Sequence, residues 1–186
     1  MASSDLVPPA RLPPRSFDPL LNIYSCARAT FFAPSDISGV GGMRRELIRA
    51  TSKWRNGAKR YDTVFIKLNN GMTGLQAFSI ARVYLFFSFR YHLTDYPCAL
   101  VDDYIVVGDG PDENTGMWRV KWPHARERIS RVIDLRDILR AAHLIPIFKD
   151  TRRTIPPEAL PETTLDKYHY FYVNKFADHH SFEIAF

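Results

Sequence analysis

The stretch Ala81-Arg82-Val83-Tyr84-Leu85-Phe86-Phe87-Ser88-Phe89-Arg90-Tyr91 decides the fold class. Its odd-numbered positions are all apolar, whereas Arg82, Ser88 and Arg90 occupy even-numbered ones. Because successive side chains of a β-strand point to opposite faces, this alternation predicts a long, half-buried strand. The odd-numbered side chains, Phe87 among them, then form the apolar face that faces a core.

Shorter segments of the same kind lie on both sides of this stretch. Together with it they predict strands near 63–68, 79–91, 96–107, 117–122 and 129–146, the last interrupted by one helical turn over 135–139. The loops between them are short, as in up-and-down antiparallel proteins. The sequence therefore predicts a mainly β fold, with a small antiparallel five-stranded barrel over residues 61–148.

The flanking regions carry other patterns. Residues 1–42 are rich in proline and predict an irregular arm. Over 43–60, Met43, Leu47, Ala50 and Trp54 recur at helical spacing before Asn56-Gly57, which predicts a basic amphipathic helix. After a proline-containing linker, residues 149–186 predict a helix over 165–179 and then a terminal strand.

Composition excludes several classes of protein. The chain has 186 residues, of which 46% are hydrophobic and 24% charged, enough for one core and too few for two enzyme domains. No apolar run reaches the roughly 18 residues of a membrane span, and the first residues lack the pattern of a secretory signal. Cys26 and Cys98 lack metal-type spacing. We expect a nuclear or cytoplasmic protein that is not secreted and has no membrane partner.

The positive charge is concentrated in one segment. The chain carries a net charge of +5, and residues 43–60 hold seven basic side chains against Glu46 alone. Such a basic segment on a near-neutral body indicates a polyanionic partner, and we expect DNA, bound without sequence preference. The candidate nucleic-acid-binding residues are Arg44, Arg45, Arg49, Lys53, Arg55, Lys59 and Arg60.

The aromatic residues allow an alternative function. Exposed rings can hold a methylated lysine by cation–π attraction, which would make the protein a chromatin-type peptide reader. The candidate peptide-binding residues are Tyr84, Tyr104, Trp118 and Trp122. Burial of these rings in the barrel core is the simpler interpretation, because most of them alternate correctly for burial.

The sequence gives no catalytic framework. Its carboxylates lie on a meander of strands and turns, unlike the convergent carboxylates of two-metal enzymes. Asp178, His179, His180 and Glu183 resemble a metal cluster but lack a third ligand at fixed spacing. No phosphate-binding loop or dinucleotide fingerprint is present. We therefore expect no enzyme activity, no cofactor and no bound metal.

Several strings, in order from residue 41 to the end, resemble the C-terminal region of Plavaka-type transposases of mushroom-forming fungi. They include Gly41-Gly42-Met43-Arg44, Ser52-Lys53-Trp54-Arg55, Tyr96-Pro97-Cys98-Ala99-Leu100-Val101, Arg140-Ala141-Ala142-His143-Leu144-Ile145-Pro146 and Tyr172-Val173-Asn174-Lys175-Phe176-Ala177-Asp178-His179-His180.

In that family the acidic catalytic triad of the DDE type lies upstream of this region. The resemblance therefore implies a non-catalytic accessory module whose partners are nucleic acid, the transposase or chromatin proteins. Asp103 stands where the family usually has an aromatic residue. The segment Val132-Ile133-Asp134-Leu135-Arg136-Asp137-Ile138 is also similar to the last strands of bromo-adjacent-homology domains, which are small barrels.

Overall fold

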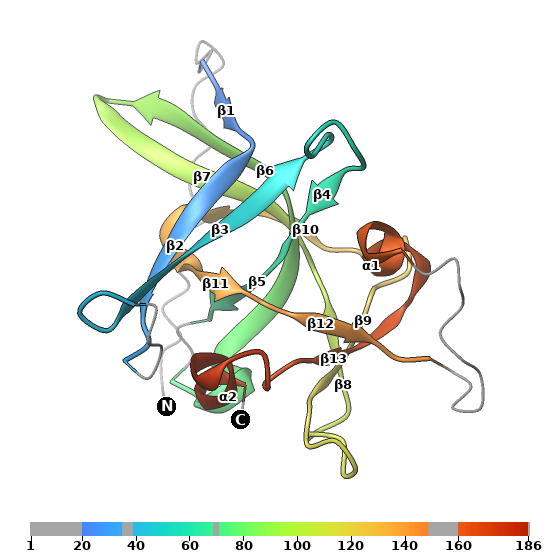
Figure 1. The fold of residues 1–186 in the computed structure, drawn as a ribbon. Coiled ribbons are helices and arrows are strands. Elements are labelled where there is room, and N and C mark those ends of the chain that lie inside the picture. The colour runs from blue at the N-terminus through green and yellow to red at the C-terminus, as the bar shows by residue number, and fades with distance from the viewer. Residues whose placement is uncertain (1–19, 35–38, 69–70, 149–159, 186) are drawn as a thin grey trace, which may run out of the picture.

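A long antiparallel hairpin forms the centre of the molecule (Figure 1). The computed structural model describes residues 20–34, 39–68, 71–148 and 160–185. In it, β6 (Phe78–Tyr91) pairs with β7 (Thr94–Asp103). The turn between them contains His92 and Leu93, both with positive φ, as a type I′ hairpin turn requires. The prediction of a mainly β fold with antiparallel strands is confirmed.

The central hairpin belongs to the largest of three sheets. This six-stranded sheet has the order β10-β7-β6-β5-β11, and β1 also pairs with β6. The remaining strands of this sheet are β1 (Asn22–Tyr24), β5 (Thr63–Lys67), β10 (Ser130–Asp134) and β11 (Ile138–Ala141). A 3-10 turn, η2 (Leu135–Asp137), joins β10 to β11 and confirms the predicted helical turn.

A second sheet has four strands, and the chain passes into it from the first sheet. Its order is β12-β13-β9-β8, with β8 (Ile105–Val107), β9 (Arg119–Lys121), β12 (Leu144–Pro146) and β13 (Tyr170–Val173). The chain enters it from β7 at Tyr104 and again from β11. The predicted strands therefore lie in two sheets, and the described residues form no closed barrel.

The third sheet is a ribbon that crosses the six-stranded sheet (Figure 1). It consists of β2 (Cys26–Phe32), β3 (Met43–Thr51) and β4 (Arg60–Tyr61). The inward side chains Phe31 and Ile48 are buried in one core with Val83 and Phe86 of the six-stranded sheet. A second core lies between the six-stranded and the four-stranded sheets, around Phe65, Trp118 and Phe171.

Helices are short and peripheral. They are η1 (Gly74–Ala77), η3 (Pro161–Thr163), α1 (Thr164–Lys167) and α2 (His179–Ile184). Within the described residues, none combines the length and the apolar character needed to cross a bilayer.

The predicted basic helix over 43–60 is wrong, because this segment forms β3, a loop and β4. Seven residue pairs join β3 to β2, and Ile48 and Ala50 become buried in the core. A helix would have buried Met43 and Leu47, which are instead 41% and 44% exposed. The prediction of an irregular arm over 1–42 is also wrong where the structure describes it, because β1 and β2 lie within this range. Residues 1–19 and 35–38 of the predicted arm lie outside the described residues.

The predicted C-terminal helix over 165–179 and the terminal strand are also wrong. Only α1 lies in the first part of that range, and β13 follows it because Phe171 and Val173 alternate into the second core between β12 and β9. The last described residues form α2, whose start is capped by the Asp178 side chain accepting a hydrogen bond from the Ser181 backbone N–H.

The face assignment within β6 changes at a bulge. Val83 pairs with Val101 and Leu85 with Leu100, so Tyr84 is the extra residue. A bulge shifts the side-chain alternation by one position. Val83 points into the core, but beyond the bulge Phe86 is the buried residue, at 2% exposed, and Phe87 is only half-buried.

This difference predicts unequal costs for two neighbouring truncations. Phe86→Ala should lower the free energy of unfolding by about 3 to 5 kcal/mol, because it leaves a cavity in the core. Phe87→Ala should cost roughly 1 kcal/mol, since its ring is already half in water. Urea denaturation of both variants checks this, and equal costs would contradict the bulge.

Candidate nucleic-acid interface

Strand β3 divides the basic segment between two faces. Arg44, Glu46 and Ile48 point toward the body of the protein, whereas Arg45 and Arg49 lie on the opposite side. This division follows from the two-residue period of a strand. The two faces therefore have different partners.

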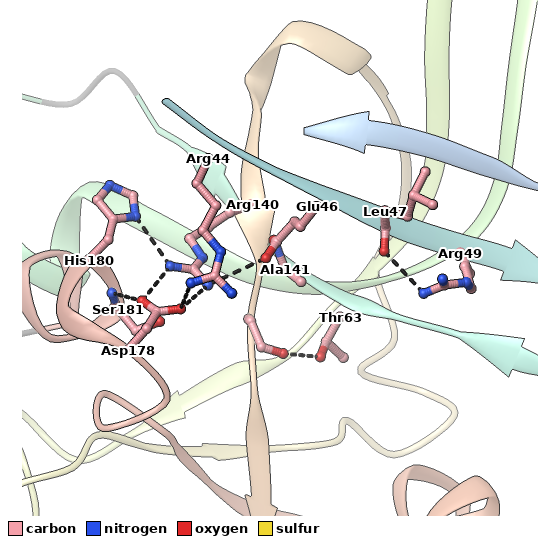
Figure 2. Close-up of polar contacts among 11 residues, drawn as sticks. Arg44, Glu46, Leu47, Arg49, Thr63, Arg140, Ala141, Asp178, His180 and Ser181 are labelled. Carbon is pink, nitrogen blue, oxygen red and sulfur yellow. Dashed lines mark hydrogen bonds and ion pairs between the residues drawn. The ribbon is translucent and has the colours of Figure 1, made fainter. Parts of the chain in front are cut away.

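The inward face is held by Arg140 of β11, which has no exposed surface (Figure 2). Its guanidinium donates to both carboxylate oxygens of Asp178, at 2.8 and 2.7 Å, and to Glu46 Oε2 at 3.4 Å. Glu46 also accepts a hydrogen bond from the Ala141 backbone N–H. Arg44 adds an ion pair with Asp178 at 3.6 Å. Two positive and two negative groups therefore balance at the junction of β3, β11 and α2.

Phe31 and His180 complete this cluster. The Phe31 ring lies 4.6 Å from the Arg140 guanidinium carbon and stacks on the His180 ring with centroids 4.7 Å apart. Burial and the neighbouring Arg140 lower the pKa of His180. Although burial alone would raise it, hydrogen bonds from Arg140 and Ser181 hold the pKa of Asp178 well below its ordinary value. The folded structure therefore stabilises the ionised form of the Asp178 carboxylate.

The outward face of the β2–β3 ribbon carries three arginines. Arg28 lies opposite Leu47, Arg45 opposite Thr30, and Arg49 opposite Cys26. Their side chains share one face because directly opposite residues of antiparallel strands point the same way. Glu46, the one acid of the basic segment, is turned to the other face. The ribbon therefore presents positive charge without an acidic residue of β2 or β3 beside it.

The loop from β3 to β4 extends this face around Trp54. Trp54-Arg55-Asn56-Gly57 forms a tight turn in which Gly57 N–H donates to the Trp54 carbonyl at 2.7 Å, and Arg55 and Asn56 have positive φ. Guanidinium carbons of Arg49, Arg55 and Arg60 lie 4.3, 5.3 and 5.5 Å from the Trp54 ring centroid. Cation–π attraction at these distances holds the arginines against the ring.

Three of the predicted binding residues already have acidic partners. These are Arg44 with Asp178, Lys59 with Asp166 at 3.1 Å, and Arg60 with Asp62 at 2.8 Å. Burial opposes ionisation of Asp166, but hydrogen bonds from Arg82 and Lys59 keep its pKa below the ordinary value. These cations stabilise the fold and are partly neutralised.

We define the arginine patch as the basic side chains of this face and of the adjoining β3–β4 loop for which the described structure shows no carboxylate partner: Arg28, Arg45, Arg49, Lys53 and Arg55. Four of them were predicted. Arg28 was missed because the sequence placed it in an irregular arm; the alternation Arg28, Thr30, Phe32 with Ala29 and Phe31 was the available signal.

The predicted aromatic quartet does not converge on one exposed site. Tyr104 and Trp118 are buried, at 5% and 8% exposed, and burial raises the pKa of Tyr104. Tyr84 contacts Tyr61, with ring centroids 5.1 Å apart. Trp122 packs edge-on against Tyr104 at 4.8 Å and carries the Arg128 guanidinium at 5.2 Å. Most of these rings serve packing, as the simpler interpretation expected.

The other candidate clusters have structural partners. Within the described residues, no group of three or more His, Cys, Asp or Glu side chains is arranged to hold a metal ion. His179 pairs with Glu183 at 3.0 Å, while Asp178 is engaged by Arg140. Asp112 accepts hydrogen bonds from the backbone of Asn114 and Thr115 and so shapes its loop.

The Arg140 cluster predicts a pH-dependent stability. Asp178→Asn should lower the free energy of unfolding by about 3 kcal/mol at pH 7, because Arg140 stays buried with a weaker partner. The folded-state pKa of Asp178 is depressed, so its contribution is complete above about pH 5 and is lost as the pH falls through the unfolded value near 3.9 and below.

Denaturant unfolding at pH 7 and pH 3 measures this effect. The difference between the parent protein and Asp178→Asn should shrink at the lower pH. Asp95→Asn is the matched control, because Asp95 forms an exposed pair with Arg90 and should change stability little at either pH. A difference that is independent of pH would contradict the assignment.

Comparisons of the chain with protein-family models, with curated proteins and with solved structures find no match.

Proposed function

We propose that this protein is a non-catalytic accessory module, nuclear or cytoplasmic, that binds nucleic acid through its phosphates on the arginine patch. The observation that carries the proposal is the concentration of three arginines on one face of the β2–β3 ribbon, with Arg55 beside Arg49 on Trp54 and Lys53 in the same loop, while Glu46 is turned away to Arg140. Guanidinium groups suit this task because they pair with phosphate oxygens in a planar, bidentate geometry.

The surroundings of Trp54 favour phosphate contacts by the arginines over stacking of a base on its ring. Its ring already carries three guanidinium groups, so a base would have to displace them in order to stack there. The ring instead holds Arg49 and Arg55 in place before the ligand arrives, which reduces the entropy lost on binding. Phosphate contacts carry no sequence information directly, so the proposed binding is non-specific.

The resemblance to transposase tails supports an accessory role. In such a role the patch would hold the nucleic acid while another part of the complex performs the chemistry. A transposase or a chromatin protein is then a natural second partner. The alternative of a methyl-lysine reader built from the aromatic quartet has less support, since two of its four rings are buried.

A salt titration tests the proposal. Binding to a labelled duplex, followed by fluorescence anisotropy, should weaken with a slope of log affinity against log salt of about −4 if the whole patch engages. Arg45→Ala, Arg49→Ala and Arg55→Ala combined should flatten the slope by about two to three, since each phosphate contact contributes about one.

The matched control removes three exposed cations elsewhere: Lys67→Ala, Arg126→Ala and Arg136→Ala. It lowers the net charge equally but should leave the slope within about one of the parent value. If the control weakens binding as much as the patch variant, net charge alone attracts the duplex. That result, or no binding of the parent protein at about 50 mM salt, would refute the proposal.

A further inference from the structure

A separate hollow lies where β9 and β13 meet α1. Its volume is about 500 Å³, and its lining includes Lys121, Trp122, His124, Lys167, Tyr168 and His169. We call it the aromatic hollow. Pockets of roughly 300 to 1,000 Å³ accommodate small organic ligands.

The aromatic walls of this hollow are fixed by their neighbours. Trp122 packs edge-on against the buried Tyr104, with ring centroids 4.8 Å apart, and carries one guanidinium, that of Arg128 at 5.2 Å, whereas Trp54 carries three. Tyr168 packs edge-on against Phe148, with centroids 5.1 Å apart and an interplanar angle of 77°. Rings held in this way offer flat apolar surfaces to a planar ligand at little entropic cost. The hollow therefore suits an aromatic ring system.

The charge of the hollow selects an anion. Lys121 and Lys167 both line it, and none of the lining residues within the described part of the chain is acidic. Glu127 pairs with Lys121 at 3.5 Å but is not among the lining residues. A methylated lysine would meet two ammonium groups here, so like-charge repulsion disfavours it. A planar ring joined to a negative group is the combination found in a nucleotide.

The hollow also lies next to the loop of Trp54. Lys59 of that loop pairs with Asp166 of α1 at 3.1 Å. Leu165 of α1 lines a second hollow, of about 580 Å³, together with Trp54 and Arg55. Lys167, two residues further along, lines the aromatic hollow. The short helix α1 therefore contributes residues to both hollows.

We propose that the aromatic hollow binds one unstacked nucleotide, with its base against Trp122 and Tyr168 and its phosphate near Lys121 and Lys167. This inference rests on the proposed function in one respect, namely that the strand supplying the nucleotide continues across the Trp54 loop to the arginine patch. A single strand, whose bases are free to leave the stack, is then the preferred ligand.

An NMR titration with adenosine 5′-monophosphate tests the site. Amide resonances of Lys121 and Tyr168 and the indole resonance of Trp122 should shift together. The mononucleotide should bind at least about tenfold more tightly than ribose 5-phosphate or adenosine, because stacking and charge attraction act jointly. Equal affinity for ribose 5-phosphate, or tighter binding of a trimethyllysine peptide, would overturn the inference.

Two variants assign the contacts. Tyr168→Leu removes a wall and Lys121→Gln removes a charge at a half-buried position, and each should weaken binding of the mononucleotide at least about fivefold. Neither Tyr168 nor Lys121 is one of the fully buried residues of the two cores. Unchanged affinity in both variants would place the mononucleotide elsewhere and overturn the assignment.

The combined Arg45→Ala, Arg49→Ala and Arg55→Ala variant separates the two proposals. It should lose duplex binding and keep its affinity for the mononucleotide. Failure of the mononucleotide to bind the parent protein, with normal duplex binding, would overturn this inference alone. Failure of the duplex to bind, with normal mononucleotide binding, would overturn the patch proposal alone.

Discussion

The buried guanidinium of Arg140 is the constraint on which the rest of the structure depends. A charge without exposed surface is tolerated only when carboxylates compensate it, and here they come from two other elements, Glu46 of β3 and Asp178 before α2. This requirement fixes which way β3 faces. With Glu46 inward, the period of two places Arg45 and Arg49 outward. The cluster that closes the fold therefore also leaves arginine as the only charged residue type of β2 and β3 on the opposite face.

The strands could be predicted where burial repeats with a period of two. β5, β6, β7 and η2 lie close to their predicted positions, because their apolar side chains enter a core on one face or both. The faces of β6 could not be predicted, since the bulge at Tyr84 depends on the register with β7. Pattern alone carries no information about an extra residue in one strand.

Elements that depend on distant partners were missed. Residues 43–54 satisfy a helical spacing as well as a strand spacing, and the seven residue pairs with β2 decide between them. Asn56-Gly57 is compatible with a helix end, but Asn-Gly is equally a hairpin signal. The basic segment was identified correctly as a charge concentration. Two of its members, Arg44 and Lys59, have their acidic partners, Asp178 and Asp166, more than 100 residues away in the sequence.

The central claim is that the outward face of the β2–β3–β4 ribbon contacts the phosphates. The most direct measurement is arginine-selective chemical modification, read out by peptide mass spectrometry, with and without a saturating duplex. We expect Arg28, Arg45, Arg49 and Arg55 to lose reactivity when the duplex binds, while Arg126 and Arg136 keep theirs. Protection of Arg126 and Arg136, with the patch arginines still reactive, would contradict the claim.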